Sequence, residues 1–243
     1  MRVLELWRYP VKSLGGERID HVDVGAAGLV GDRAWGIHHA ERGTVLTARR
    51  APELLFASAR LIDENEVAIT LPDGKEVSSA DDGADAAISA WLGRAVTLVR
   101  PGTEGSTYEN PMDIENESDW ISWQGPAWSF HDSTKTMVSI VGSATLGDRD
   151  VRRFRTNVVI EGGDEDDLVG SPIRLGTARL DVTKPIDRCI MVTRPQPGLA
   201  RDLDVLKTVI RERNNMLSVG ALVTAPGHVS LGDTLTLWSE DDC

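Results

Sequence analysis

Apolar and polar residues alternate over short stretches along the first hundred residues, and glycines separate these stretches. A period of two is typical of a strand that buries one of its faces. The strands expected from this pattern cover residues 3–7, 17–24, 34–38, 54–61, 67–71 and 95–99. Residues 81–91 differ, because their apolar positions recur at helical spacing and Gly93 follows them, which predicts a helix.

The second half has the same character. Strands are expected at 137–141, 157–160, 173–175, 178–183, 218–224 and 234–238, and helices at 144–151 and 203–213. Short strands that are rarely joined by helices favour antiparallel barrels with peripheral helices over a parallel, doubly wound sheet. The predicted fold class is therefore α+β, mainly β. An N-terminal β-barrel-like domain covers residues 1–100 and a second β-barrel with peripheral helices covers 136–243, while interleaving of the two stays open.

The connecting segment, residues 101–135, breaks the pattern because it is acidic and rich in tryptophan. Its acidic residues, which no Lys or Arg interrupts, are Glu104, Glu109, Asp113, Glu115, Glu117 and Asp119. Three tryptophans follow: Trp120, Trp123 and Trp128. A connection of this length is usually functional or disordered. Two interpretations remain open: a solvated insertion whose tryptophans pack on the core, or a rim over a substrate pocket.

Composition narrows the function classes. Lys and Arg number 26 against 38 Asp and Glu, so the net charge is −12. This acidity argues against nucleic acid and against anionic membranes as partners, since both require a cationic surface. No apolar run reaches the roughly 18 residues of a membrane span, and a charge interrupts the apolar N-terminus, so we expect a cytoplasmic protein. Dinucleotide, P-loop and nucleophile-elbow motifs are absent from the sequence.

Candidate chemistry lies in short segments that place cations and one cysteine at predicted strand ends. These segments carry Lys12 and Ser13, Arg33, Thr47 and Arg49, Arg155 and Asn157, and Arg188 with Cys189. In so acidic a chain they indicate either a small anionic ligand or ordinary surface ion pairs. Cys189 is either a small buried hydrophobe or a reactive, metal-binding thiolate. Cys243, at the end of the chain, is interpreted as incidental.

Taken together, these segments resemble the molybdenum-cofactor-binding family that joins an N-terminal β-barrel to a MOSC domain, which includes the mitochondrial amidoxime-reducing component. The matching segments run in the family's order over nearly the whole chain: Tyr9-Pro10-Val11-Lys12-Ser13, Gly28-Leu29, Gly31-Asp32-Arg33, Trp35, Thr47-Ala48-Arg49, Phe154-Arg155, Asn157, Arg188-Cys189 and Gly232-Asp233. Residues 104–128 match nothing in that family.

The resemblance implies that Cys189 is the thiolate ligand of molybdenum and the catalytic position. Residues that match cofactor-contacting positions are Lys12, Ser13, Arg33, Arg155 and Asn157, with Thr47 and Arg49 as weaker matches. The implied cofactor is molybdopterin with its molybdenum. Neither PLP nor an iron–sulfur cluster is expected, since two cysteines cannot ligate a cluster. Electrons are therefore expected from a separate electron-transfer protein.

The function implied is reduction of a small N-hydroxylated or otherwise N-oxygenated compound. Two alternatives use the same residues: a non-catalytic carrier of the molybdenum cofactor, and a PLP-independent sulfur-handling protein with a persulfide on Cys189. The His131-Asp132-Ser133 segment lies where relatives carry a similar aspartate, but its flanks differ, so it is given no role.

Overall fold

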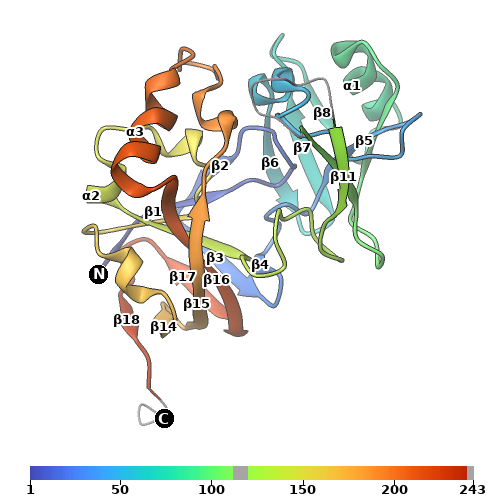
Figure 1. Cartoon of the computed structure of the whole chain (residues 1–243). Coiled ribbons are helices and arrows are strands. Elements are labelled where there is room, and N and C mark those ends of the chain that lie inside the picture. Colours follow the sequence, from blue (N-terminus) through green and yellow to red (C-terminus); the bar gives the residue numbers. More distant parts are fainter. Residues whose placement is uncertain (112–119, 240–243) are drawn as a thin grey trace.

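The computed structural model describes residues 1–111 and 120–239, which form two lobes side by side (Figure 1). The larger lobe is built on an eight-stranded sheet. Its strands, in spatial order, are β18 (Leu235–Leu237), β14 (Pro172–Leu175), β15 (Ala178–Asp187), β16 (Met216–Ala225), β12 (Val138–Gly142), β13 (Val158–Ile160), β1 (Val3–Arg8) and β2 (Glu17–Ile19). A second sheet of the lobe comprises β17 (Gly227–Ser230), β3 (His21–Gly25) and β4 (Gly28–Leu29).

The smaller lobe contains three antiparallel groups of strands. They are β6 (Ser58–Asp63), β7 (Glu66–Thr70) and β8 (Glu76–Ser78); β5 (Gly36–His39) and β9 (Val96–Val99); and β10 (Thr107–Pro111) and β11 (Trp120–Gln124). The helix α1 (Ala84–Leu92) covers this lobe, and Gly93 ends it in the left-handed conformation with φ of 64°. The mainly β, α+β fold class expected from the sequence is confirmed.

Strands from the two ends of the chain pair in the larger lobe. β1 is antiparallel to β13, with Leu6 opposite Val158, and β3 is antiparallel to β17. The chain therefore begins in the larger lobe and contacts the smaller lobe between β1 and β2, where Val11 and Leu14 pack in its core. It crosses to the smaller lobe after β4 and returns with β12. The two predicted domains, 1–100 and 136–243, are interleaved at this point, since the first 29 residues share sheets with the C-terminal strands.

Alternating side chains of the large sheet enter two different cores. Ile140 and Val158 pack inward against the three-stranded sheet, with Val22 and Val229 in the same cluster. The neighbouring residue Val141 points the other way and packs under the helices. Those helices are α2 (Ser143–Leu146), α3 (Leu203–Arg213) and the 3₁₀ turns η2 (Val151–Arg153) and η4 (Ile190–Thr193). A further 3₁₀ turn, η3 (Glu165–Leu168), contributes Leu168 to the first core.

Several predicted elements are wrong in detail. Residues 17–24 form two strands, β2 and β3, which lie in different sheets. Residues 54–61 are not one strand: Pro52 begins the 3₁₀ turn η1 (Pro52–Phe56), because its fixed φ suits the first turn of a helix, and β6 follows. The helix expected at 144–151 ends at Leu146, where Gly147 has a φ of 59°. The connecting segment contains the hairpin β10–β11 rather than only irregular chain; Asp113, Glu115, Glu117 and Asp119 lie outside the described residues.

The longest described helix, α3, has 11 residues, and within residues 1–111 and 120–239 no helix has the length and apolarity needed to cross a bilayer.

Candidate functional site

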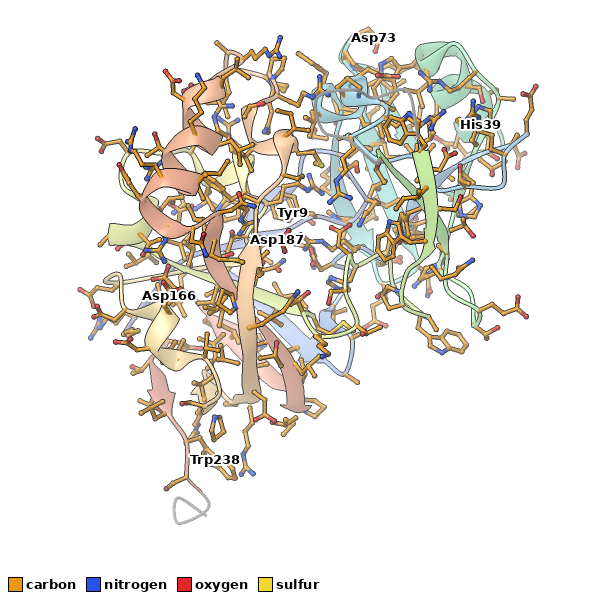
Figure 2. The ribbon with its side chains drawn as sticks, viewed as in Figure 1. Tyr9, His39, Asp73, Asp166, Asp187 and Trp238 are labelled. Atoms are coloured by element: carbon orange, nitrogen blue, oxygen red, sulfur yellow. The ribbon has the colours of Figure 1, made fainter. Side chains whose placement is uncertain are left out.

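A cavity of about 390 Å³ lies where the two lobes meet, and residues of both lobes line it. Tyr9 and Asp187, labelled in Figure 2, mark the junction of the lobes. Every predicted site residue lies in the cavity wall: Lys12, Ser13, Arg33, Thr47, Arg49, Arg155, Asn157 and Cys189. The structure thus brings Lys12 and Cys189, which are 177 positions apart in the chain, into the wall of one cavity.

Three of these residues have left-handed backbone conformations. Ser13, Arg33 and Arg155 have φ angles of 68°, 49° and 54°. Such angles are uncommon for residues with a Cβ, and they cluster at functional sites where the surrounding structure maintains them. Here the tight turns present three polar side chains to one cavity.

Two of the cavity's arginines pack on one aromatic ring. The guanidinium carbons of Arg155 and Arg33 lie 4.4 and 5.2 Å from the ring centre of Tyr9, which is buried. Arg33 also donates to the carbonyl oxygen of Arg155 at 3.0 Å, and Arg155 donates to the carbonyl oxygen of Leu14. Burial, reinforced by the charge of Arg33, lowers the pKa of Arg155 to about 10, so Arg155 stays cationic at neutral pH.

A buried aspartate holds this part of the site together. Asp32 accepts hydrogen bonds from the amide nitrogen of Tyr9 at 2.7 Å and from Nδ2 of Asn157 at 3.0 Å, and it pairs with Arg33. Asn157 also donates to the Trp7 carbonyl and accepts from the hydroxyl of Ser139 at 2.8 Å. Because both amide hydrogens and the oxygen of Asn157 are engaged by the protein, this side chain supports the cavity wall from behind.

A buried lysine, Lys12, lies in the turn that follows β1, next to Ser13. Nζ of Lys12 donates to the Phe130 carbonyl and to Oδ1 of Asp132, each at 2.8 Å. Burial lowers the pKa of Lys12, and the nearby Asp132 partly opposes that shift. Desolvation would raise the pKa of Asp132, but Lys12, Arg49 and Arg33 together lower it below its usual range. Asp132 is therefore a carboxylate at neutral pH, with 63% of its side chain exposed.

Cys189 lies just beyond the end of β15, where η4 begins, and is a free, half-buried thiol. Arg49 is hydrogen-bonded to its sulfur. Although burial would lower the pKa of Arg49, the Cys189 sulfur and the carboxylate of Asp132 raise it overall. A cation from the smaller lobe thus directly contacts the cysteine of the larger lobe.

Two further arginines fix the chain on either side of Cys189. Arg188 donates to the carbonyl oxygens of Leu217 and Phe154 at 2.8 and 2.9 Å. Arg153 donates to the carbonyls of Val192 and Arg194, both at 3.2 Å. Both side chains line the cavity, and their hydrogen bonds to backbone carbonyls hold the chain on either side of Cys189 in place.

Some polar groups in the wall lack a protein partner. The hydroxyl of Thr47 is buried and has no hydrogen-bond partner in the described part of the chain. The ammonium group of Lys184 makes no hydrogen bond or ion pair with any residue of 1–111 or 120–239. A buried hydroxyl without a partner, such as that of Thr47, costs free energy unless a ligand or water engages it.

Two family descriptions match the chain, one in each half. The MOSC N-terminal beta barrel domain matches residues 1–97, and the MOSC domain matches residues 136–236. The chain belongs to the MOSC-domain family.

Relatives of this MOSC chain include two proteins named molybdenum cofactor sulfurase. The one from Drosophila mojavensis is 23% identical over 257 residues, covering 92% of this chain and 32% of that protein. The one from Danio rerio is 24% identical over 260 residues, covering 88% and 31%. The chain thus spans about a third of the length of these relatives.

Two solved structures are also similar. The YuaD protein from Bacillus subtilis aligns over 96% of this MOSC chain and 93% of its own, with a TM-score of 0.47 and 14% identity. YiiM from Geobacillus stearothermophilus aligns over 57% and 75%, with a TM-score of 0.36 and 17% identity.

The donor set of the MOSC-chain cavity fits the chemistry of a molybdenum cofactor. A phosphate requires cations and hydroxyl donors, which Arg33, Arg155 and the unpartnered Lys184 and Thr47 can provide. Cys189 provides one soft sulfur donor, the type that suits a metal already bound by sulfur. No group of three or more metal-ligating side chains occurs among the described residues.

Sequence reasoning did not identify several residues of this site. Asp132 was given no role because its flanking residues offered no match, and only the fold shows it paired with Lys12. Lys184 had a detectable signal, as a cation five residues before Cys189 and directly after the strand expected at 178–183, but it was not singled out. Trp123 lies in a segment where sequence alone left two interpretations open. Cys243 lies outside the described residues.

Proposed function

We propose that the protein is a molybdenum-cofactor-dependent reductase of small N-hydroxylated compounds that receives electrons from a separate protein. The observation that carries this proposal is the position of Cys189, which shares one cavity with Arg33, Arg49 and Arg155. A soft ligand for the metal and cations for the rest of the cofactor thereby occur at one site. The family membership and the name of the relatives support a molybdenum-related role.

When bound, the cofactor supplies two-electron removal of oxygen from the substrate. Overall, the N–O bond breaks, two electrons and two protons are consumed, and water and the amine or amidine leave. Cys189 would hold the metal, and Arg49 keeps that sulfur in place. Lys12, Ser13, Arg33, Arg155 and Thr47 would bind the pterin edge and the phosphate, while Asn157 holds Asp32 and with it Arg33.

The proposal is tested by measuring molybdenum and reductase activity on protein from a host that makes the cofactor. The wild type should contain about one molybdenum per chain and reduce benzamidoxime when a chemical or protein electron donor is supplied. Cys189→Ser should fold normally and lose turnover by a factor of roughly 100 or more, since removal of a group that contacts the reacting centre costs about 3 kcal/mol or more of transition-state stabilisation. A matched control, Ser133→Ala, changes the cavity wall at an unassigned position.

Wild-type turnover retained in Cys189→Ser would contradict the assignment of the cysteine. Absence of molybdenum from the wild type, when a control molybdenum enzyme from the same host is loaded, would contradict the proposal as a whole.

A second candidate, a carrier or sulfur-handling protein for the same cofactor, is favoured by the name of the sulfurase relatives. The same preparation separates the two functions. A carrier releases intact cofactor to an apo-enzyme and shows no benzamidoxime reduction. A sulfur-handling protein forms a persulfide on Cys189 when a sulfane-sulfur donor such as thiosulfate is added, and sulfite is the leaving group.

A further inference from the structure

The hairpin β10–β11 brings one aromatic side chain to the cavity. Tyr108 and Trp123 are opposite each other in the ladder, and their rings stack with centroids 4.8 Å apart and an interplanar angle of 23°. Trp123 lines the same cavity as Asp132, Cys189 and Met191. Trp120 of the same strand does not line it and instead lies under the guanidinium group of Arg50, 4.4 Å from its ring centre. The two tryptophans therefore have different environments.

Tyr108, the inner ring of this stack, is held in place by its neighbours. Tyr108 is fully buried and packs with Val45 and Phe130, and Nζ of Lys12 lies 4.9 Å from its ring centre. Gly125, which follows the hairpin, lies so close to Tyr108 that a Cβ there would approach the ring to 2.2 Å. Only glycine permits this approach. Since Tyr108 has no room to move, the ring of Trp123 stacked on it has a defined orientation.

Trp123 is half-buried, and its side chain belongs to the cavity wall that also includes Cys189. Aromatic rings prefer offset-stacked or edge-to-face partners, and they also attract cations over their faces. The carboxylate of Asp132, which is ionised at neutral pH, lines the same cavity. A planar ring that carries an amidine group matches both neighbours, with the ring on the indole and the cationic group near the carboxylate.

We propose that Trp123 is a specificity-determining residue, which selects planar aromatic N-hydroxylated substrates over aliphatic ones by stacking against them. This inference rests on the proposed function, because it names the substrate class of that same site. It also assigns a role to the connecting segment, whose Trp123 forms part of the cavity wall.

Equilibrium binding tests the inference without requiring turnover. Calorimetric titration of the molybdenum-loaded wild type would use benzamidine, an aromatic reduction product, and acetamidine, its aliphatic counterpart. Trp123→Leu should weaken benzamidine binding about 10-fold and leave acetamidine binding within twofold, because a stacked aromatic pair is lost only for the first ligand. Trp120→Leu is the matched control, which should leave the affinity for both ligands within twofold of the wild type.

A second measurement uses only the wild-type protein and so does not depend on how the variants fold. The indole N–H resonance of Trp123 should shift when benzamidine is added and should stay in place with acetamidine. An unmoved resonance, no benzamidine binding by the wild type, or equal affinity for benzamidine in Trp123→Leu and the wild type would each overturn the inference.

The two proposals fail separately. Benzamidine binding that depends on Trp123, in a protein that reduces no amidoxime, supports the aromatic site and contradicts the reductase. Reductase activity together with benzamidine binding that does not depend on Trp123 supports the reductase and contradicts the aromatic site.

Discussion

Ser13 is among the residues whose backbone strain and side-chain contacts can be separated experimentally. It has a φ of 68°, and its hydroxyl oxygen accepts a hydrogen bond from the Ala48 amide at 3.0 Å. That bond connects the turn after β1 to the segment containing Thr47 and Arg49. The residue thus combines an unfavourable backbone conformation with a contact that links two parts of the cavity wall.

The variants Ser13→Ala and Ser13→Gly remove the same hydroxyl but differ in backbone freedom. We expect Ser13→Gly to be more stable than Ser13→Ala by about 1 kcal/mol, because a Cβ in the left-handed region costs roughly that much. Urea unfolding at neutral pH measures the difference. Equal stability of the two variants would show that the turn carries no such strain.

At the scale of single elements, the 3₁₀ turn η3 contains a buried carboxyl group. Glu165 is 0% exposed, accepts a hydrogen bond from the Thr145 hydroxyl at 2.9 Å, and lies 3.7 Å from Arg213. Its other oxygen, Oε1, has no hydrogen-bond partner among the described residues. Burial raises the pKa of Glu165, while Thr145 and Arg213 only partly oppose the shift.

A raised pKa in the folded state means that the ionised form of Glu165 opposes folding. Relative to the ionised form, protonated Glu165 stabilises the folded state. This stabilisation is complete below the unfolded-state pKa, about 4.3, and is lost as the pH rises through the folded-state pKa. Glu165→Gln should therefore increase the free energy of unfolding at pH 7 relative to the wild type, and this gain should vanish at about pH 4. Unfolding curves at several pH values measure it, and parallel profiles for the two proteins would contradict the prediction.

At the scale of the whole molecule, the first strand contributes to the core of the last hundred residues. Leu6 of β1 is fully buried in the cluster that contains Val158 and Ile160, whereas Leu4 of the same strand is 42% exposed. The larger lobe is therefore complete only when both ends of the chain are present. The cavity depends on the same arrangement, because the turn after β1 carries Lys12 and Ser13.

We expect Leu6→Ala to lower the free energy of unfolding by about 2–5 kcal/mol, as is usual for a large-to-small change in a core. Leu4→Ala on the same strand should cost under about 1 kcal/mol, since its side chain is largely in water. Hydrogen exchange provides the sharper readout. The amides of β13, which pair with β1, should lose protection in Leu6→Ala, and unchanged protection there would contradict the shared core.

The sequence by itself determined the elements whose signals are local. The helix α3 has the bounds that the pattern predicted, because both of its ends have local signals. Asp202 caps its start, and Asn214 adopts the left-handed conformation directly after Arg213. Alternation likewise placed most of the predicted strands within two residues of their observed bounds, since period-two burial is a property of the strand itself. The candidate site residues were also recognisable, because each lies in a short turn segment with a distinctive composition.

Tertiary structure alone decided how these pieces combine. The pairing of β1 with β13, the contact of Arg49 with Cys189 and the ion pair of Lys12 with Asp132 join residues that are distant in the chain. The hairpin β10–β11 was also missed, because its strands are stabilised by Tyr108 packing in a core that only the folded chain assembles. Long-range packing leaves no periodic trace in the local sequence, so the wall formed by Trp123 could be identified only from the fold.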